Sequence, residues 1–276
     1  MERNKLLAHS ARFGYPEQPY KEHIYEVVKI ALEAASKVVP YTPFGKLFLS
    51  IVRAAAEYHD LGKLDEANQK VLAGKSGKSL KIDHCDAGTA YLLLKNSISA
   101  ALCVLAHHNP GLRSIPMENA KKDYPFRIRT IPVGEIKTVR EITDERLEEY
   151  IKKHESEIGD GPSLPTDLFR NPSCLRFVLS CLVDADHANT ARHYGREIDA
   201  PEIPLAPKKR LALLDSYVNS FPAEDIDPER LSIRQAFYDA CHIEAESRGL
   251  YSCSMPVGTG KTTSVMAHLL KAAARF

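Results

Sequence analysis

The chain has 276 residues, of which 44% are hydrophobic and 26% are charged, the composition of an ordinary globular protein. This length allows one large domain or two small ones. The formal net charge of +1 argues against a uniformly basic surface, so any groove for nucleic acid has to be local. No apolar run approaches about 18 residues, which excludes a membrane-spanning helix. The six cysteines form no CxxC pair, and we expect reduced thiols in a cytoplasmic protein.

Two predicted helices near the start of the chain place histidines on their buried faces. His23 opens a helix whose apolar residues follow at helical spacing: Ile24, Val27, Val28, Ala31 and Val38. The stretch 45–58 has the same spacing at Leu47, Phe48, Ile51, Val52 and Ala55. His59 lies four residues past Ala55 and extends this stripe, with Asp60 about 100° further round the helix. A buried imidazole and carboxylate are costly unless something binds them, and a metal ion removes that cost.

Two later helices end on polar residues in the same way. Ile98, Ala101, Leu102 and Leu105 form a stripe that His108 continues, with His107 beside it. In 171–195 the stripe is Leu175, Val178, Leu179 and Leu182. Asp186 lies four residues beyond Leu182 and continues the stripe, whereas Asp184 points away. Ligands presented from the apolar faces of several helices build metal sites inside bundles. A single such histidine is instead typical of a satisfied core residue, as we expect for His154.

The order of these residues resembles a known family: His23, His59-Asp60, His84, His107-His108, Asp186. It is the order of the HD phosphohydrolase superfamily. More narrowly, the motifs HDLGK, DHCDAG, AHHNPGL and LVDAD are similar to the HD nuclease domain of the CRISPR-associated helicase-nuclease of type I interference systems, over residues 15–200. The resemblance implies an all-α fold, an HD helical bundle with a metal site in its core. It also implies cleavage of single-stranded DNA beside a helicase, with a crRNA-guided CRISPR surveillance complex as partner.

One or two divalent transition metals are expected in such a site. We assign His23, His59, Asp60 and Asp186 to one ion, and Asp60, His84, His107 and His108 to the other, with Asp60 as the catalytic bridge. Imidazole-rich shells suit Mn, Ni, Co, Fe or Zn better than Mg or Ca. Lys63, one turn after Asp60, is expected to contact a substrate phosphate, the alternative being a surface lysine at a helix end. Asp83 or Asp86 either orients the His84 ring or is solvated.

An irregular insertion separates His108 from a helix predicted at 144–158. It interleaves basic and aromatic residues: Arg113, Lys121, Lys122, Tyr124, Phe126, Arg127, Arg129, Lys137 and Arg140. Such a mixture can follow a phosphate backbone and stack bases, and the alternative is a solvated loop anchored by its aromatics. The alternation over 127–131 is compatible with a short strand.

The C-terminal sequence SCSMPVGTGKTTSVMAHLL indicates a short strand, a glycine-rich turn and a helix. It resembles the helicase form PxGxGKT, with Met255 where a strict phosphate-binding loop has glycine. The resemblance implies that ATP and Mg²⁺ bind in a full-length helicase, through Gly258, Thr259, Gly260, Lys261 and Thr262. Gln235, in IRQAFYDACH, matches an adenine-reading glutamine. Only 14 residues follow Thr262. We therefore expect a chain truncated just after the first helicase motif, a remnant of a RecA-like domain that does not hydrolyse ATP.

The domain boundaries are predicted from proline and charge. Pro201, Pro204 and Pro207 indicate a connector, after which a helix ending near Phe221 is expected to pack back on the bundle. We expect a nuclease domain at 1–221, a linker at 222–230 and a helicase fragment at 231–276, in a monomer. The expected function is a metal-dependent phosphodiesterase acting on single-stranded DNA. The alternatives are an HD-type phosphohydrolase of nucleotides or other small phosphate esters, and a metal-free binding module, which the full ligand set disfavours.

Overall fold

The computed structural model describes residues 5–74, 79–108, 112, 127–159, 161, 163–166, 171–196, 203–221, 227–243 and 251–275. It divides into a first unit, residues 1–198, and a second unit, residues 199–276. Helices dominate both, and the strands in the described residues form a single two-stranded sheet. The expectation of a mostly helical protein is therefore confirmed. None of the helices in these ranges combines the length and apolar character needed to cross a bilayer.

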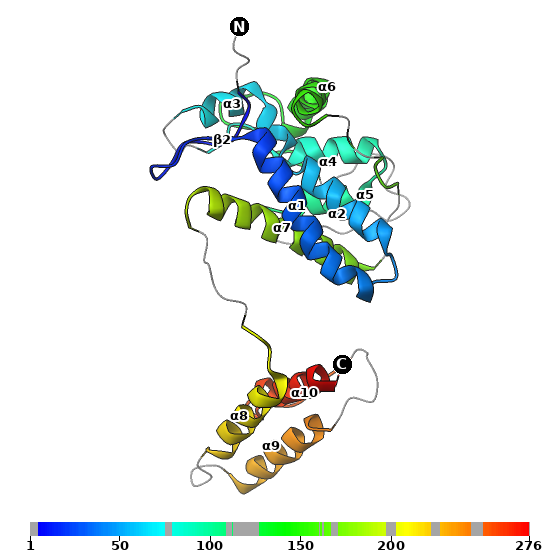
Figure 1. Ribbon diagram of the computed structural model, residues 1–276, viewed down its shortest axis with the longest axis vertical. Helices are drawn as coiled ribbons and strands as arrows, with labels where there is room; N and C mark the ends of the chain where they lie inside the picture. Colours follow the sequence, from blue (N-terminus) through cyan, green and yellow to red (C-terminus); the bar gives the residue numbers. More distant parts are fainter. Residues whose placement is uncertain are drawn as a thin grey trace. The chain divides into compact units, whose positions relative to one another are not determined.

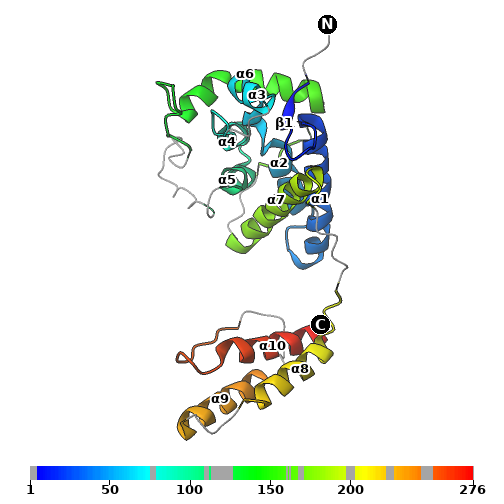
Figure 2. The same ribbon diagram turned by 90° about the vertical axis from the view of Figure 1, so that its left-hand side faces the viewer.

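The first unit is a bundle of seven helices in its described residues, with two short 3-10 turns and one antiparallel strand pair. Its elements are β1 Leu7–His9, β2 Gln18–Pro19, α1 Tyr20–Val38, η1 Val39–Tyr41, α2 Lys46–Tyr58, η2 Leu61–Leu64, α3 Glu66–Leu72, α4 Cys85–Leu94, α5 Ile98–Ala106, α6 Val139–Ile158 and α7 Pro172–His193. Helix α1 packs on α2 and α7, while α4 packs on α5 and α6 (Figure 1). Helix α2 lies between α1 and α5 (Figure 2), so the residues at its end are enclosed by the bundle.

The apolar stripes predicted from the sequence form the core of this bundle. Phe48, Ile51 and Val52 of α2 are fully buried, as are Val178 and Leu182 of α7. Leu47 and Leu179, at the edges of the same stripes, are partly buried and pack against the core. The phase of both helices therefore agrees with the sequence pattern, because one face of each is removed from water.

Two glycines let the backbone close tightly around the end of α2. A Cβ atom on Gly88 would lie 1.9 Å from the Tyr58 carbonyl oxygen, and one on Gly62 would lie 2.6 Å from the His84 Cα atom. No side chain fits at either distance, so only glycine permits these approaches. The Gly62 amide also donates to the His84 carbonyl at 3.2 Å. The 3-10 turn after α2 is thereby fixed against the start of α4.

Asn68 of α3 fixes the segment that leads to α4. Its Nδ2 donates to the Gly62 and Ile82 carbonyls at 2.9 and 2.8 Å, and its Oδ1 accepts from the Lys81 and Ile82 amides at 2.8 and 2.9 Å. The side chain is fully buried. All four hydrogen-bonding positions of the amide are therefore used, which joins the turn after Asp60 to the segment that precedes His84.

The region after the insertion differs from the sequence prediction. Residues 127–131 are not a strand, although Ile128 and Thr130 carbonyls accept from the Arg140 and Val139 amides. Helix α6 begins at Val139 rather than near 144 because Thr138 and Glu141 form a capping box. Five residues of the predicted basic and aromatic surface lie outside the described residues: Arg113, Lys121, Lys122, Tyr124 and Phe126. That interpretation therefore stays a prediction.

The second unit contains α8 Pro207–Asn219, α9 Pro228–Cys241 and α10 Lys261–Arg275. Helix α10 packs on both α8 and α9, and Asp215 of α8 accepts from the Tyr238 hydroxyl at 2.7 Å and from the His242 ring at 2.8 Å. The unit boundary thus falls near residue 198 and not near 221, because α8 finds its partners on the C-terminal helices. Residues 251–256, predicted to contain a short strand, are not in one.

Candidate metal centre

Asp60 lies where α2 gives way to the turn η2, and both of its carboxylate oxygens face histidines. Oδ2 is 3.0 Å from His23 Nε2 and 3.4 Å from His59 Nε2, while Oδ1 is 3.4 Å from His84 Nε2. Lys63 Nζ approaches Oδ2 to 2.6 Å. The carboxylate is completely buried, yet neither oxygen accepts a hydrogen bond of good geometry. The buried carboxylate thus has imidazole nitrogens near both of its oxygens.

In both His23 and His59, one ring nitrogen contacts a neighbouring oxygen of the bundle and the other faces the site. His23 Nδ1 lies 2.7 Å from Asn189 Oδ1, and His59 Nδ1 lies 2.8 Å from the Ala56 carbonyl. Both partners are acceptors, so each Nδ1 donates to the scaffold and each Nε2 faces the cluster. Those two Nε2 atoms are 3.2 Å apart. Two imidazole nitrogens and a carboxylate at this spacing, all buried, form a group that could hold a metal ion.

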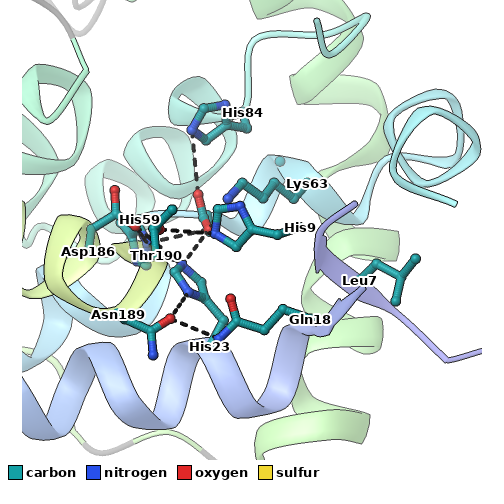
Figure 3. A network of polar contacts seen from close by, with 12 residues as sticks. Leu7, His9, Gln18, His23, His59, Lys63, His84, Asp186, Asn189 and Thr190 are labelled. Carbon is teal, nitrogen blue, oxygen red and sulfur yellow. Dashed lines mark hydrogen bonds and ion pairs between the residues drawn. The ribbon is translucent and has the colours of Figure 1, made fainter. Parts of the chain in front are cut away.

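Asn189 is in turn held by the strand pair. Its Oδ1 also accepts from Gln18 Nε2 at 2.9 Å, so one amide oxygen receives both donors (Figure 3). Carboxylate or carbonyl oxygens behind a ligand imidazole set its tautomer and orientation in metal sites. Asn189 and Gln18 have this relation to His23.

His84, His107 and His108 gather on the other side of Asp60. The His107 ring centroid is 5.6 Å from that of His84 and 4.1 Å from that of His108, and the His84 and His108 centroids are 4.9 Å apart. His107 Nδ1 donates to the Val104 carbonyl at 2.5 Å, which leaves its buried Nε2 as a lone pair without a partner. Ligand atoms of His84, Cys85 and His107 lie within 4.8 Å of one another. This second group is also able to hold an ion.

Asp186 of α7 faces the cluster as its helical phase predicts. Its Oδ1 is 3.5 Å from His23 Nε2 and 3.8 Å from His59 Nε2, and its Oδ2 is 3.8 Å from His108 Nε2. Asp186 is 5% exposed, whereas Asp184 is on the exposed face of the same helix. The carboxylate that continues the apolar stripe is the one that reaches the histidines.

The site holds its carboxylates ionised and most of its imidazoles neutral. Burial opposes ionisation of Asp60 and Asp186, but the neighbouring His59, with Lys63, outweighs it and holds the pKa of both carboxyls below the usual range. Burial lowers the pKa of His84 to about 3 and that of His107 well below its ordinary value. Burial also acts on His59, where Asp60 and Asp186 prevail and raise its pKa. Deprotonated carboxylates and neutral imidazoles are the forms that bind metals.

The structure brings together all seven residues assigned as ligands, in one continuous cluster. The contacts do not divide these residues by ion, because ligand atoms of His59, His107 and Asp186 lie within 4.8 Å of one another and Asp186 Oδ2 also faces His108, so the assignment to two ions stays a prediction. The sequence pattern put His108 on the buried stripe and His107 beside it, and this order of burial is wrong. His107 is buried, and the His108 side chain is 41% exposed, because α5 ends at Ala106 and the helical phase no longer applies.

The structure also decides between the alternatives left open for Lys63 and for the two aspartates beside His84. Lys63 is 6% exposed and paired with Asp60, so it is not a surface lysine. Neither aspartate beside His84 orients its ring. Asp83 accepts from the Cys85 amide, and Asp86 binds the Arg127 guanidinium through two hydrogen bonds of 3.2 and 2.6 Å. As expected, His154 is a core residue, fully buried and 3.0 Å from the Tyr20 hydroxyl.

Sequence reasoning missed His9, Gln18 and Asn189. His9 and Gln18 come from short strands, where no helical period marks a buried face. Ligand atoms of His9, His23 and Asp186 nonetheless lie within 4.8 Å of one another. Asn189 had a usable signal, because it follows Asp186 by three residues and shares its helix face.

In the second unit, part of the predicted nucleotide site borders one cavity of about 350 Å³, which Gln235, Thr259 and Gly260 help to line. Lys261 Nζ donates to the Met255 and Pro256 carbonyls at 2.7 and 2.8 Å. The Lys261 ammonium therefore donates to carbonyls of the segment that leads into the glycine-rich turn. Thr262 is exposed. Gly258 has a φ of +85°, a conformation that favours glycine. Nucleotide binding by these residues stays a prediction.

Comparison with known proteins adds no relative. The chain matches no protein-family model, no curated protein and no solved structure.

Proposed function

We propose that this protein is a metal-dependent nuclease that hydrolyses phosphodiester bonds of single-stranded DNA. The observation that carries the metal-dependent part is the buried meeting of His23 Nε2 and His59 Nε2, 3.2 Å apart, beside the Asp60 carboxylate. Their other ring nitrogens donate to acceptors, so both Nε2 atoms and the Asp60 carboxylate face one point. A metal ion at that point would bind both nitrogens and the carboxylate.

The donor set fits one or two divalent transition metals. His23, His59, Asp60 and Asp186 would hold one ion, and Asp60, His84, His107 and His108 would hold a second. Imidazole nitrogens in this number favour Mn, Fe, Co, Ni or Zn over Mg or Ca. When bound, such ions supply an activated water and neutralise charge on a phosphoryl group.

The chain's own residues prepare the site for an anion. Lys63 contributes a nearly buried ammonium whose partner is the Asp60 carboxylate. When a substrate is bound, Lys63 would donate to a non-bridging phosphate oxygen. Asn189 holds the His23 ring, and the Ala56 and Val104 carbonyls hold His59 and His107. The groups that orient these imidazole rings are thus backbone carbonyls or a buried amide, which limits movement of the rings during the reaction.

The choice of a DNA strand as substrate rests on the resemblance and on the second unit. The motifs of the first unit are similar to those of CRISPR-associated HD nucleases, and the second unit carries the turn PVGTGKT beside Gln235. A nucleotide-driven helicase suits a polymer substrate. We therefore propose that the nuclease acts with an ATP-dependent helicase and a CRISPR surveillance complex. The alternative is hydrolysis of nucleotides or other small phosphate esters, for which the same metal cluster would serve.

Metal content and substrate choice test the proposal together. Elemental analysis of the purified protein should find transition metal, and Mn²⁺, Co²⁺ or Ni²⁺ should support cleavage of a labelled single strand that a chelator stops. Asp60→Ala should remove the activity while the helical circular dichroism remains. Robust cleavage in a strong chelator, or a fully active Asp60→Ala variant, would refute the assignment. Faster hydrolysis of mononucleotides than of the strand would favour the alternative.

A further inference from the structure

His9 is a histidine on the strand β1 that no helical pattern marks, and the structure ties this strand firmly to the site. The Leu7 amide donates to Gln69 Oε1 and the Leu7 carbonyl accepts from Gln69 Nε2, both at 2.9 Å. The same Nε2 donates to the Lys63 carbonyl at 2.7 Å. One side chain of α3 thus joins the strand that carries His9 to the turn that carries Lys63.

The His9 ring lies against the residues already grouped around the first ion. Its centroid is 4.8 Å from that of His23 in an edge-on contact, and its Nε2 is 3.3 Å from the Thr190 hydroxyl oxygen. Thr190 follows Asp186 by one turn of α7 (Figure 3). His9 is only partly buried, whereas His23 is fully enclosed. The ring therefore reaches the cluster from a strand, beside Thr190 of α7, and stays partly open to solvent.

The donor atoms lie nearly close enough together to share a single ion. Ligand atoms of His9, His23 and Asp186 lie within 4.8 Å of one another, and metal–nitrogen and metal–oxygen bonds of roughly 2.0–2.2 Å allow separations up to about 4.4 Å. A shift of a few tenths of an ångström would close the shell. We propose that His9 is a further metal-ligating residue, which shares an ion with His23 and Asp186.

This inference rests on the metal centre proposed above, but not on the nature of the substrate. It gives the N-terminal strand a defined role, because the strand brings a ligand that the bundle does not contain. Gln69 is then a positioning residue, since its side chain binds the Leu7 amide, the Leu7 carbonyl and the Lys63 carbonyl. His9 would add to the affinity for the metal ion only while strand β1 is packed against the bundle.

Metal titration of the full chain tests the inference without an activity assay. His9→Phe keeps an aromatic ring against His23 but has no ring nitrogen, and His193→Phe is the control, since His193 contacts the Pro16 carbonyl. Co²⁺ is added to each protein after metal removal, and the visible absorption band is followed. We expect His9→Phe to weaken binding of one ion by about tenfold or more and to alter its band, while His193→Phe behaves like the unchanged protein.

The outcomes separate the two proposals. If the unchanged protein binds no Co²⁺, Mn²⁺ or Ni²⁺, the metal centre and the role of His9 both fail. If it binds but His9→Phe gives the same affinity and the same band, only the role of His9 is overturned. His9→Asn serves as a second variant should His9→Phe not fold, with the same expected weakening.

Discussion

Removing the Asn68 amide should destabilise the first unit by an amount that follows from its contacts. Asn68→Ala deletes four hydrogen bonds to backbone groups, of 2.8 to 2.9 Å. At roughly 1 kcal/mol net for each bond, the free energy of unfolding should fall by about 4 kcal/mol. For a unit of this size the melting temperature should drop by about 8–16 °C. Because Ile82 leads directly to His84, metal affinity should fall as well.

Denaturant titration followed by circular dichroism measures the change, in metal-free protein so that ligand binding does not contribute. Lys70→Ala is the control on the same helix, because Lys70 is exposed and paired only with Glu66 at the surface. Asn68→Asp keeps an acceptor for the Lys81 and Ile82 amides but loses both donations, and should be at least as destabilised as Asn68→Ala. A loss below about 1 kcal/mol for Asn68→Ala would show that water replaces the amide, and the reasoning would be refuted.

Three further predictions concern the site and the packing around it. Asp186→Ala should abolish cleavage and weaken metal binding, whereas the exposed Asp184→Ala should retain most of both; the reverse pattern would contradict the observed burial. In metal-free protein, the buried His84 and His107 have lowered pKa values, so the unfolded chain takes up protons first as the pH falls below about 6.5. Stability should therefore decrease from pH 7 toward pH 4.5, and an unchanged denaturation midpoint would argue against the burial of neutral imidazoles. Gly88→Ala places a Cβ against the Tyr58 carbonyl and should cost about 1–3 kcal/mol or more of stability, which thermal unfolding will detect.

Much of the first unit could be predicted because its helices have one strongly apolar face. The period of 3.6 residues relates each polar residue to the stripe before it, and that relation is local. It placed Asp186 inward and Asp184 outward, as the structure has them. The same logic failed at His107 and His108, because the helix stops at Ala106 and the backbone after it follows no period.

The packing of α8 shows a different limit of the sequence. Its apolar residues predict a helix with a face to bury, but they do not identify the surface that covers it. The structure pairs α8 with α10 and α9 in the second unit, so the boundary moves by more than twenty residues from the predicted one. Hydrophobic burial is non-directional, and the choice of partner depends on the shapes and connections of all the elements present.

The ligand types and their helical phases were determined by the sequence alone, since residue identity and local period need no knowledge of distant contacts. Only the tertiary structure decided how Asp60 divides its two oxygens between His23 and His84, and that His9 arrives beside His23 from a strand. It also decided that Asn189 and Gln18 stand behind the His23 ring. These relations join residues far apart in the chain, and they arise when packed helices fix backbone positions that no local pattern encodes.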